Sequence, residues 1–346
     1  MYRVGVVGAG PGVSALHLPT LAGLRDRFEV VHIADAGSGR ARQLAERTGA
    51  SWSSGPEGIL DDPDVDVVAL CSPPGEHAAQ ILAAVAAGKR AVFCEKPLGV
   101  SRAEIDAAVG ACIDGEVALV VGTNHLFDPS WERVKHRLDA TGAAVRSVSI
   151  TLALAPNGRY HDAASDLLVG PPPASRPPVD PADTHVAGGI VRQLIVGLAV
   201  HDLPLVRDVA PELEGVDFAR LVSPIGFDIG FRASGIAVRH TAVMLPDGAD
   251  TLWRVTLVTD QDRVEIDFPP PFVPAGSGRV SVQDAAGRRT AFPPAPMNGY
   301  EAEWHALAAM LAGERPMEYD ELRADAVYAV SIADQAARLI RDGAAA

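Results

Sequence analysis

The sequence predicts a doubly wound parallel α/β sheet over the first third of the chain, followed by an α+β domain built on a large, mainly antiparallel sheet. Before residue 123, Val-rich apolar runs alternate with segments of helical periodicity, and from Leu213 onward strand-like segments follow one another without helices between them. At 346 residues the chain is too long for one ordinary core. We therefore expect two domains, residues 1–123 and 124–346.

The strands expected in the first domain are short apolar runs bounded by Gly, Pro or Asp. Near-continuous apolar strands are buried on both faces, which is typical of a parallel sheet. Between them Ala and Leu recur at helical spacing, and Ser101 with Glu104 three residues later forms a capping-box pattern. The runs are Val4–Val7, Val30–Ala34, Val65–Leu70, Arg90–Phe93 and Ala118–Val121, and the helical segments are Arg40–Arg47, His77–Ala87 and Arg102–Cys112.

After Gly122 the pattern changes. Trp131–Leu138 predicts a helix, Ala144–Ala155 a long strand and Gly189–Val209 a long apolar helix. The proline-dense stretch Pro171–Pro181 can form neither a helix nor a central strand, so it predicts a surface loop or lid. Several strands and two closing helices follow, among them Ile236–Val243, Leu252–Thr259, Arg263–Phe268, Tyr300–Leu311 and Glu321–Arg341.

Charge and composition favour a small-molecule partner. The formal net charge is -14, and no run of Lys or Arg indicates a nucleic-acid or anionic-membrane partner. We see no signal peptide and no apolar stretch of the ~20 residues that a membrane span needs, so we expect a cytoplasmic protein. Cys71, Cys94 and Cys112 lack metal-type spacing and are expected to be buried thiols; no metal site is expected.

The first strand runs into a glycine-rich turn, Gly8–Val13, of the Rossmann type. Glycines there let the backbone approach a pyrophosphate, although Val13 occupies the third glycine position. Asp35 ends the second strand, where a carboxylate binds the ribose diol and would repel the extra phosphate of NADP. We therefore expect NAD; NADP is the alternative, with Arg40 or Arg42 folded over its phosphate. A tight turn with an unrelated surface aspartate is the other reading. The expected cofactor-binding residues here are Gly8, Gly10, Pro11, Gly12, Val13 and Asp35.

Two further motifs, Cys71–His77 and Cys94–Leu98, each follow a buried strand. Together with the glycine turn, His17-Leu18-Pro19 and Asp35, this series resembles the Gfo/Idh/MocA family (glucose–fructose oxidoreductase and inositol dehydrogenase). The resemblance implies NAD(P)-linked oxidation or reduction of a sugar, cyclitol or related hydroxy or keto compound. It also implies a homodimer or homotetramer that pairs through the second-domain sheet, and a cis Lys96–Pro97 peptide bond. The cofactor-binding residues that it adds are Ser72, Pro73, His77, Glu95, Lys96 and Asn124.

Lys96 is the first expected catalytic residue. It lies beyond the carboxyl end of a parallel strand, where open α/β sheets bind ligands. A lysine beside a carbonyl oxygen can polarise it and relay a proton, whereas the alternative is a solvated lysine in a loop. Asn124 is expected to touch nicotinamide or substrate. Family members often carry arginines where His125 and Leu126 stand, so this chain departs from the family pattern at that part of the anion-binding surface.

His201 is the second expected catalytic residue. In the family, a glycine-rich entry leads to a helix carrying D-x-x-x-H; here Gly188-Gly189 is the entry, His201 matches the histidine and Gly197 stands at the aspartate. Residues four apart are neighbours on a helix, so an acid there would orient and charge the imidazole. Asp202, about 100° away on an ideal helix, is a poor substitute. His201 is therefore expected as the acid/base, with substrate binding or packing as the alternative. Weaker candidates are His125, His161 and Asp183.

These residues favour a dehydrogenase or ketoreductase acting on a polyhydroxylated small molecule, in which Lys96 polarises the oxygen and His201 assists proton transfer. A nucleotide-binding sensor without redox turnover is one rival, supported by the missing carboxylate at Gly197. An enzyme that keeps NAD bound and oxidises its substrate transiently to cleave a glycosidic bond is the other.

Overall fold

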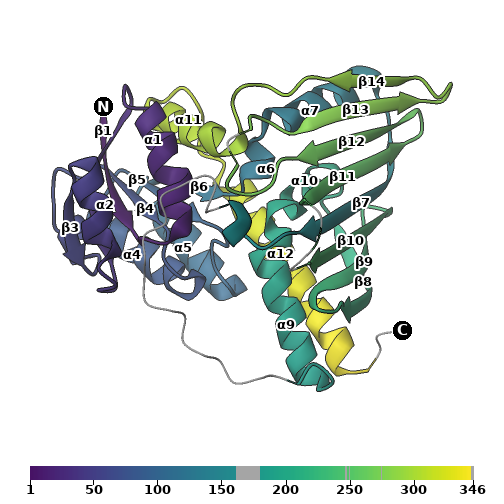
Figure 1. The fold of residues 1–346 in the computed structure, drawn as a ribbon, viewed down its shortest axis with the longest axis horizontal. Helices are drawn as coiled ribbons and strands as arrows, with labels where there is room; N and C mark the ends of the chain where they lie inside the picture. The colour runs from purple at the N-terminus through teal and green to yellow at the C-terminus, as the bar shows by residue number, and fades with distance from the viewer. Residues whose placement is uncertain (161–179, 246–247, 249, 274, 344–346) are drawn as a thin grey trace. The chain divides into compact units, whose positions relative to one another are not determined.

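The computed structural model describes residues 1–160, 180–245, 248, 250–273 and 275–343 (Figure 1). Its described residues form two compact units, Met1–Gly122 with Glu303–Val327, and 123–160 with 180–302 and 328–343. Each is considered by itself, and the domain boundary expected at residue 123 stays a prediction. His161 and nearly all of the expected loop Pro171–Pro181 lie outside the described residues.

The first unit contains a six-stranded, all-parallel sheet in the order β3-β2-β1-β4-β5-β6, which confirms the predicted doubly wound sheet. The residues of β4 and β6 are buried throughout, which explains why apolar runs marked these strands. The sequence prediction missed β3, because its residues, Ser51-Trp52-Ser53-Ser54, form a largely exposed edge strand without an apolar run. The strands are β1 (Tyr2–Val7), β2 (Phe28–Asp35), β3 (Ser51–Ser54), β4 (Val67–Leu70), β5 (Ala91–Glu95) and β6 (Ala118–Gly122).

Short helices connect these strands. Ser101 caps α5 as predicted: its Oγ accepts from the Glu104 backbone N–H at 3.3 Å, and the Glu104 carboxylate accepts from Val100 N–H at 2.8 Å. In a standard capping box the Glu104 carboxylate would accept from the N–H of Ser101 itself; here its partner is the N–H of the residue before the cap. The helices are η1 (Val13–His17, a π-turn), α1 (Leu18–Gly23), α2 (Arg40–Thr48), α3 (Glu57–Leu60), η2 (Pro74–Glu76, 3₁₀), α4 (His77–Ala86) and α5 (Arg102–Asp114), with parts of α11 (Gly299–Leu311) and α12 (Tyr319–Arg341).

The second unit is built on an eight-stranded sheet in the order β14-β13-β12-β11-β7-β10-β9-β8. The β7–β10 pair is parallel and the other described pairs are antiparallel, which confirms the mainly antiparallel sheet. Burial alternates along β11 and β12, as expected when one face packs on the core. The strands are β7 (Val145–Leu154), β8 (Leu213–Leu221), β9 (Ile225–Ala233), β10 (Ile236–Met244), β11 (Leu252–Thr259), β12 (Asp262–Phe268), β13 (Arg279–Asp284) and β14 (Arg289–Phe292).

The predicted single helix Gly189–Val209 is wrong. The segment forms α9 (Thr184–Gly197), a 3₁₀ turn η3 (Ala199–His201) and α10 (Leu203–Val209), with a bend of 65° at the last junction. Pro204 stands in the first turn of α10, where it is tolerated, whereas inside a continuous helix it would remove a hydrogen bond and clash with the preceding turn. None of the described helices is alone long and apolar enough to span a membrane; this bent pair together meets the length and composition criteria.

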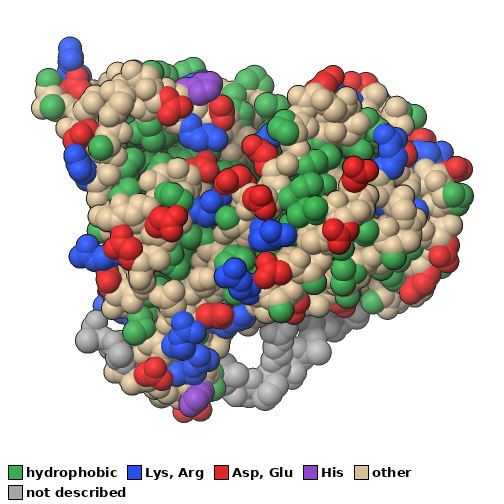
Figure 2. Space-filling model, turned by 180° about the vertical axis from the view of Figure 1, so that it is seen from behind, with side chains coloured by type: hydrophobic (Ala, Val, Ile, Leu, Met, Phe, Trp, Pro, Cys, Tyr) green, Lys and Arg blue, Asp and Glu red, His purple; other side chains and the backbone are tan. Residues whose placement is uncertain are grey.

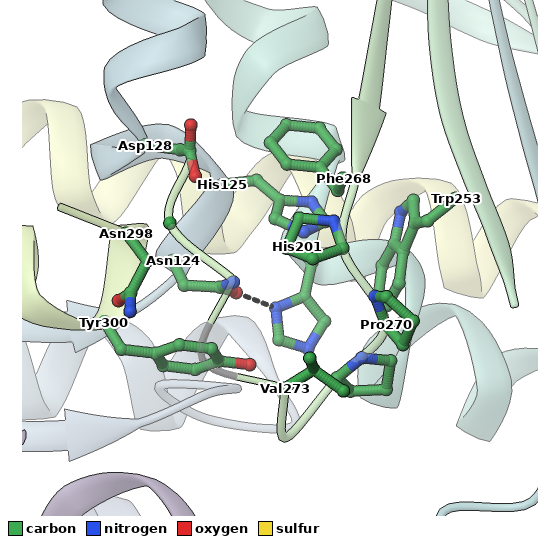
Figure 3. A pocket seen from close by; sticks show the side chains of 14 residues that line it. Asn124, His125, Asp128, His201, Trp253, Phe268, Pro270, Val273, Asn298 and Tyr300 are labelled. Carbon is green, nitrogen blue, oxygen red and sulfur yellow. Dashed lines mark hydrogen bonds between the residues drawn. The ribbon is translucent and has the colours of Figure 1, made fainter. Parts of the chain in front are cut away.

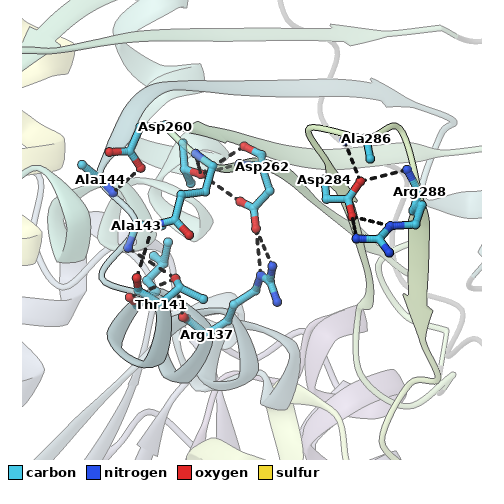
Figure 4. Close-up of polar contacts among 12 residues, drawn as sticks. Arg137, Thr141, Ala143, Ala144, Asp260, Asp262, Asp284, Ala286 and Arg288 are labelled. Atoms are coloured by element: carbon cyan, nitrogen blue, oxygen red, sulfur yellow. Dashed lines mark hydrogen bonds and ion pairs between the residues drawn. The ribbon is translucent and has the colours of Figure 1, made fainter.

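Two carboxylates hold the carboxyl-terminal end of helix α7 (Pro129–Thr141) to the turn between β11 and β12 (Figure 4). Arg137 donates from Nε and Nη2 to Asp262 Oδ2 at 3.0 and 2.5 Å, and Ala144 N–H donates to Asp260 Oδ1 at 3.0 Å. The preceding short helix α6 (Asn124–Phe127) leads directly into α7 (Pro129–Thr141). The segment that carries Asn124 is therefore followed by a firmly anchored helix.

Acidic and basic side chains are interspersed over the face of the molecule shown in Figure 2. That face carries no extended region of positive charge, in keeping with the net charge of -14.

Candidate functional site

The glycine turn of the first unit begins at Gly8, the residue after β1. Its φ of 110° disfavours any other residue, and a Cβ there would lie 2.4 Å from the carbonyl oxygen of Cys71. A Cβ on Gly10 or Gly12 would meet no atom within 4 Å. The turn thus packs tightly on one side against the end of β4 and leaves open space beside Gly10 and Gly12, which fits the close approach of a pyrophosphate.

Asp35, at the end of β2, is engaged by the loop that follows it. Its Oδ1 accepts from Gly37 N–H at 2.8 Å and Ser38 N–H at 3.1 Å; its Oδ2 accepts from Ala41 N–H at 3.0 Å and from the Ser38 hydroxyl. Burial alone would raise the pKa of Asp35, but these hydrogen bonds together lower it. The carboxylate is therefore ionised at neutral pH and holds the start of α2 in place.

His77 joins the two motif loops. It is fully buried, with Nδ1 at 2.7 Å from the Pro97 carbonyl oxygen and Nε2 at 2.9 Å from the Ser72 carbonyl oxygen. Ser72 itself donates from Oγ to Gln80 at 2.5 Å, while Pro73 is exposed. His77 thus positions the loop after β4 against the loop after β5.

Lys96 follows β5 at the carboxyl edge of the parallel sheet, and the Lys96–Pro97 peptide bond is cis, as predicted. Burial lowers the pKa of Lys96, although the adjacent Glu95 carboxylate opposes that shift. A lysine whose pKa is lowered exchanges protons more readily near neutral pH than an ordinary surface lysine.

Glu95 connects Lys96 to a buried histidine. Its Oε1 lies 2.8 Å from His17 Nε2, and its Oε2 accepts from the Lys96 backbone N–H at 3.2 Å. Burial alone would lower the pKa of His17, but Cys71 and Glu95 raise it well above its usual value. Glu95, predicted as a cofactor-binding residue, is thus half of an ion pair behind the lysine.

A pocket in the second unit contains the other predicted catalytic residue, His201 (Figure 3). His201 Nδ1 lies 2.7 Å from Asn124 Oδ1, so Asn124 supports this imidazole. Aromatic and proline residues surround the pair. The lining residues are Asn124, His125, Asp128, His201, Trp253, Phe268, Pro269, Pro270, Pro271, Val273, Gly276, Asn298, Gly299 and Tyr300.

The expected helical relation between Gly197 and His201 is wrong. Gly197 ends α9 and His201 lies on η3, so the rule for residues four apart on one helix does not apply. Asp202, set aside as a poor substitute for the missing carboxylate, is fully buried and accepts from His125 Nδ1 at 2.8 Å. Its imidazole partner is therefore His125 and not His201.

Sequence reasoning missed most of the pocket wall. Trp253 and Phe268 come from strands, Asn298 from a loop and Tyr300 from the start of helix α11; no motif marks them. Asp183, one of the weaker candidates, accepts from His185 and Val186 N–H and caps α9.

Three comparisons with known proteins bear on this arrangement. Residues 2–123 match the model of an oxidoreductase family with an NAD-binding Rossmann fold, Gfo/Idh/MocA. The similarity to this family extends over residues 2–123, which are the Rossmann part of the chain. This match confirms, for residues 2–123, the family resemblance indicated by the glycine turn and the two loop motifs.

Two inositol dehydrogenases are among its relatives. Myo-inositol 2-dehydrogenase of Thermotoga maritima is 30% identical over 138 residues, which cover 40% of this chain and 40% of that protein. The match thus spans less than half of that relative. Inositol 2-dehydrogenase of Rhizobium meliloti is 28% identical over 350 residues, which cover 98% of this chain and 97% of that protein.

Among solved structures, the 3-ketoreductase KijD10 of Actinomadura kijaniata, in complex with NADP and TDP-benzene, superposes with a TM-score of 0.73 at 22% identity. The superposition covers 96% of each chain. At this identity the likeness shows the shared fold of both units and nothing more.

Proposed function

We propose that this protein is a nicotinamide-dependent oxidoreductase that interconverts an alcohol and a ketone on a sugar or cyclitol. The observation that carries the proposal lies in the first unit. There the open glycine turn after β1 and Lys96 after β5 stand at the same carboxyl edge of one parallel sheet. The names of the inositol dehydrogenase relatives and of the 3-ketoreductase support this reaction class.

Different residues of the chain are proposed to bind the cofactor and to act on the substrate. The Gly8–Gly12 turn would hold the pyrophosphate, and Asp35 would lie beside the adenosine ribose. When bound, the nicotinamide supplies the chemistry of hydride acceptance or donation. Lys96 polarises the substrate oxygen, and an imidazole of the second-unit pocket, for which the sequence names His201, assists the transfer of the hydroxyl proton.

NAD is the dinucleotide that we propose. Asp35 is ionised, and its negative charge disfavours a 2′-phosphate on the ribose. Because the loop after Asp35 already occupies both of its oxygens, this discrimination is expected to come from charge more than from new hydrogen bonds.

The pocket in the second unit suits an uncharged, hydroxyl-bearing ring. Its lining residues include no lysine or arginine in the described part of the chain. Asp128, the carboxylate among them, is buried and accepts from Ser130 and Gly278 N–H. Aromatic faces such as Trp253 and Tyr300 pack against the C–H surfaces of such rings, while the Asn124 and Asn298 amides offer hydrogen bonds to hydroxyls.

A turnover assay tests the proposal. Purified protein is incubated with NAD⁺ or NADP⁺ and a panel of inositols, unphosphorylated sugars, nucleotide sugars and glycosides, and the absorbance of reduced nicotinamide is followed. We expect the dinucleotide to be reduced in the presence of at least one cyclitol or sugar. Tight dinucleotide binding without turnover would support a sensor, and release of an aglycone without net reduction would support glycoside cleavage.

The role of Lys96 is tested by substitution. We expect Lys96→Ala to lower kcat by at least ~100-fold, since it removes a proton-handling group, and to lose more turnover than His201→Ala. Lys135→Ala, which removes a surface lysine paired with Glu132 and Asp208, is the control. If Lys96→Ala and His201→Ala both keep wild-type turnover, the active-site assignment is wrong.

A further inference from the structure

Asp202 is a fully buried carboxylate between η3 and α10. His125 Nδ1 lies 2.8 Å from its Oδ1, and Trp253 Nε1 donates to both oxygens at 3.0 Å. A third ring, His240, has Nε2 at 3.6 Å from Oδ2. A buried charge is costly unless donors surround it, so this carboxylate orients the groups that point at it.

His125 is fixed on two further sides. Its ring stacks on Phe268, with centroids 3.7 Å apart and an interplanar angle of 6°, and meets Trp253 edge-on at 4.6 Å. With Nδ1 donating to Asp202, a neutral His125 carries its lone pair on Nε2. Nε2 has no hydrogen-bond partner among the described residues, and His125 is part of the pocket wall (Figure 3).

His201 is held differently. Its Nδ1 faces the amide oxygen of Asn124 at 2.7 Å, and the two imidazole centroids are 5.6 Å apart. A neutral amide stabilises a positively charged ring less than a carboxylate does. Among the described residues, Asp202 is the carboxylate that contacts an imidazole of this pocket at hydrogen-bond distance, and that imidazole is His125.

We propose that His125, positioned by Asp202, is the imidazole that exchanges the proton with the substrate oxygen, and that His201 with Asn124 orients the substrate. This inference rests on the proposed function. In the oxidation direction, the proton of the substrate hydroxyl would pass to His125 Nε2, and a hydride would pass from the carbon that bears this hydroxyl to the oxidised nicotinamide. The O–H and C–H bonds thus break and the C=O bond forms. Asp202 stabilises the imidazolium that results.

His125→Asn is the decisive variant, because the asparagine amide N–H can replace Nδ1–H toward Asp202 while the ring nitrogen that exchanges protons is lost. We expect kcat to fall by at least ~100-fold with KM changed by less than about threefold. His201→Asn should act in the opposite sense, with a larger change in KM than in kcat. His136→Asn is the matched control, since His136 is also paired with a carboxylate, Glu132 at 3.0 Å, but lies exposed on α7.

A second variant and a spectroscopic measurement guard against misfolding. Asp202→Asn should also lower kcat by at least ~10-fold, since it keeps the shape but removes the charge that stabilises the imidazolium. In proton NMR of wild-type protein, a downfield Nδ1–H signal should be present and should disappear in His125→Asn. Thermal unfolding shows whether each variant is folded.

The outcomes separate the two hypotheses. If wild-type protein turns over a sugar or cyclitol and folded His125→Asn does so equally well, this inference is overturned and the proposed function stands. If wild-type protein reduces neither dinucleotide with any compound of the panel, the proposed function fails first and the inference fails with it. A folded Asp202→Asn variant with undiminished kcat would also overturn the positioning role.

Discussion

At the scale of single residues, cofactor choice depends on Asp35. We expect NAD to bind at least about tenfold more tightly than NADP, which corresponds to ~1.4 kcal/mol. Asp35→Ser should reduce the preference for NAD over NADP, because it removes a charge that repels the 2′-phosphate and leaves a hydroxyl for the loop N–H groups. Calorimetric titration of NAD and NADP into wild-type protein and the Asp35→Ser variant measures the four dissociation constants. Equal affinities in wild-type protein would contradict the assignment and favour Arg40 or Arg42 as phosphate ligands.

A second residue, Glu303, makes stability depend on pH. Its side chain is fully buried, neither carboxylate oxygen has a hydrogen-bond partner in the described structure, and Trp304 beside it stacks on Phe93. Burial, reinforced by Glu95, raises the pKa of Glu303 well above its usual value. In the unfolded chain the carboxyl ionises near its usual value of about 4.3, so the free energy of unfolding falls as pH rises from there toward the folded pKa.

Glu303→Gln removes that loss. We expect the variant to be more stable than wild type by at least ~1 kcal/mol near pH 8. This difference in the free energy of unfolding should close toward pH 4, where the Glu303 carboxyl of wild-type protein becomes neutral in the folded and the unfolded state alike. Chemical denaturation at several pH values measures it. Glu314→Gln, at an exposed residue in the turn after α11, is the control and should show no such trend. A stability difference that is constant with pH would show that folding does not raise the pKa of Glu303.

Residue-level prediction from the sequence succeeded where a motif marked the position. The Gly8 turn follows from a local pattern, and the cis bond after Lys96 was implied by the family resemblance that the motifs carry. Asp202 could not be ranked correctly, because its value depends on contacts with His125 and Trp253, which come from other elements. A lone buried carboxylate leaves no periodic signal in the sequence.

At the scale of elements, α9 contains two adjacent glycines with opposite surroundings. A Cβ on Gly188 would lie 2.9 Å from the Ala337 carbonyl oxygen of α12 and 3.1 Å from Arg341 Cγ, whereas one on Gly189 would meet nothing within 4 Å. Gly188 is thus required by the close packing of two helices, and Gly189 is not.

These surroundings predict opposite effects of the same substitution. Gly189→Ala should raise the free energy of unfolding by about 0.5–1 kcal/mol, because it reduces the conformational freedom of the unfolded chain and suits a helix interior. Gly188→Ala should lower it by about 1–3 kcal/mol through overpacking. Denaturant unfolding compares the two. Equal stabilisation by both substitutions would refute the close packing of α9 on α12.

The break between α9 and α10 shows the limit of periodicity. Apolar residues recur across residues 189–209, so periodicity alone predicts one helix, and Pro204 was the available sign of interruption. In physical terms the apolar pattern reports burial of both pieces in the core, while the path of the backbone between them is decided by the proline and by packing. Edge strand β3 was missed for the converse reason, because exposed strands carry no apolar run.

At the scale of the whole molecule, the sequence predicted the type of both sheets. Strands that alternate with helices specify a parallel sheet, whereas strands that follow one another without helices specify an antiparallel one.

The face of the large sheet opposite its core carries a distinctive surface. Along β11 this face presents Leu252 and Val258, which are 37% and 40% exposed, with Arg254 between them, whose Nε lies 2.6 Å from Asp267 Oδ1 on β12. An open face that carries apolar side chains between paired charges is suited to a self-complementary contact.

We therefore expect the chain to form a homodimer or homotetramer through this face, as the family resemblance implies. Thr151 lies on it, directly between Arg254 of β11 and Thr241 of β10. Thr151→Glu places like charges near each other across a two-fold contact and should lower the mass measured by light scattering toward that of the 36.1 kDa monomer. Ala107→Glu, which adds the same charge at an exposed position of helix α5 in the first unit, should leave the mass unchanged. A wild-type chain that is monomeric at every concentration tested would show that the open face pairs with nothing, and that its exposed leucine and valine are tolerated as isolated surface residues.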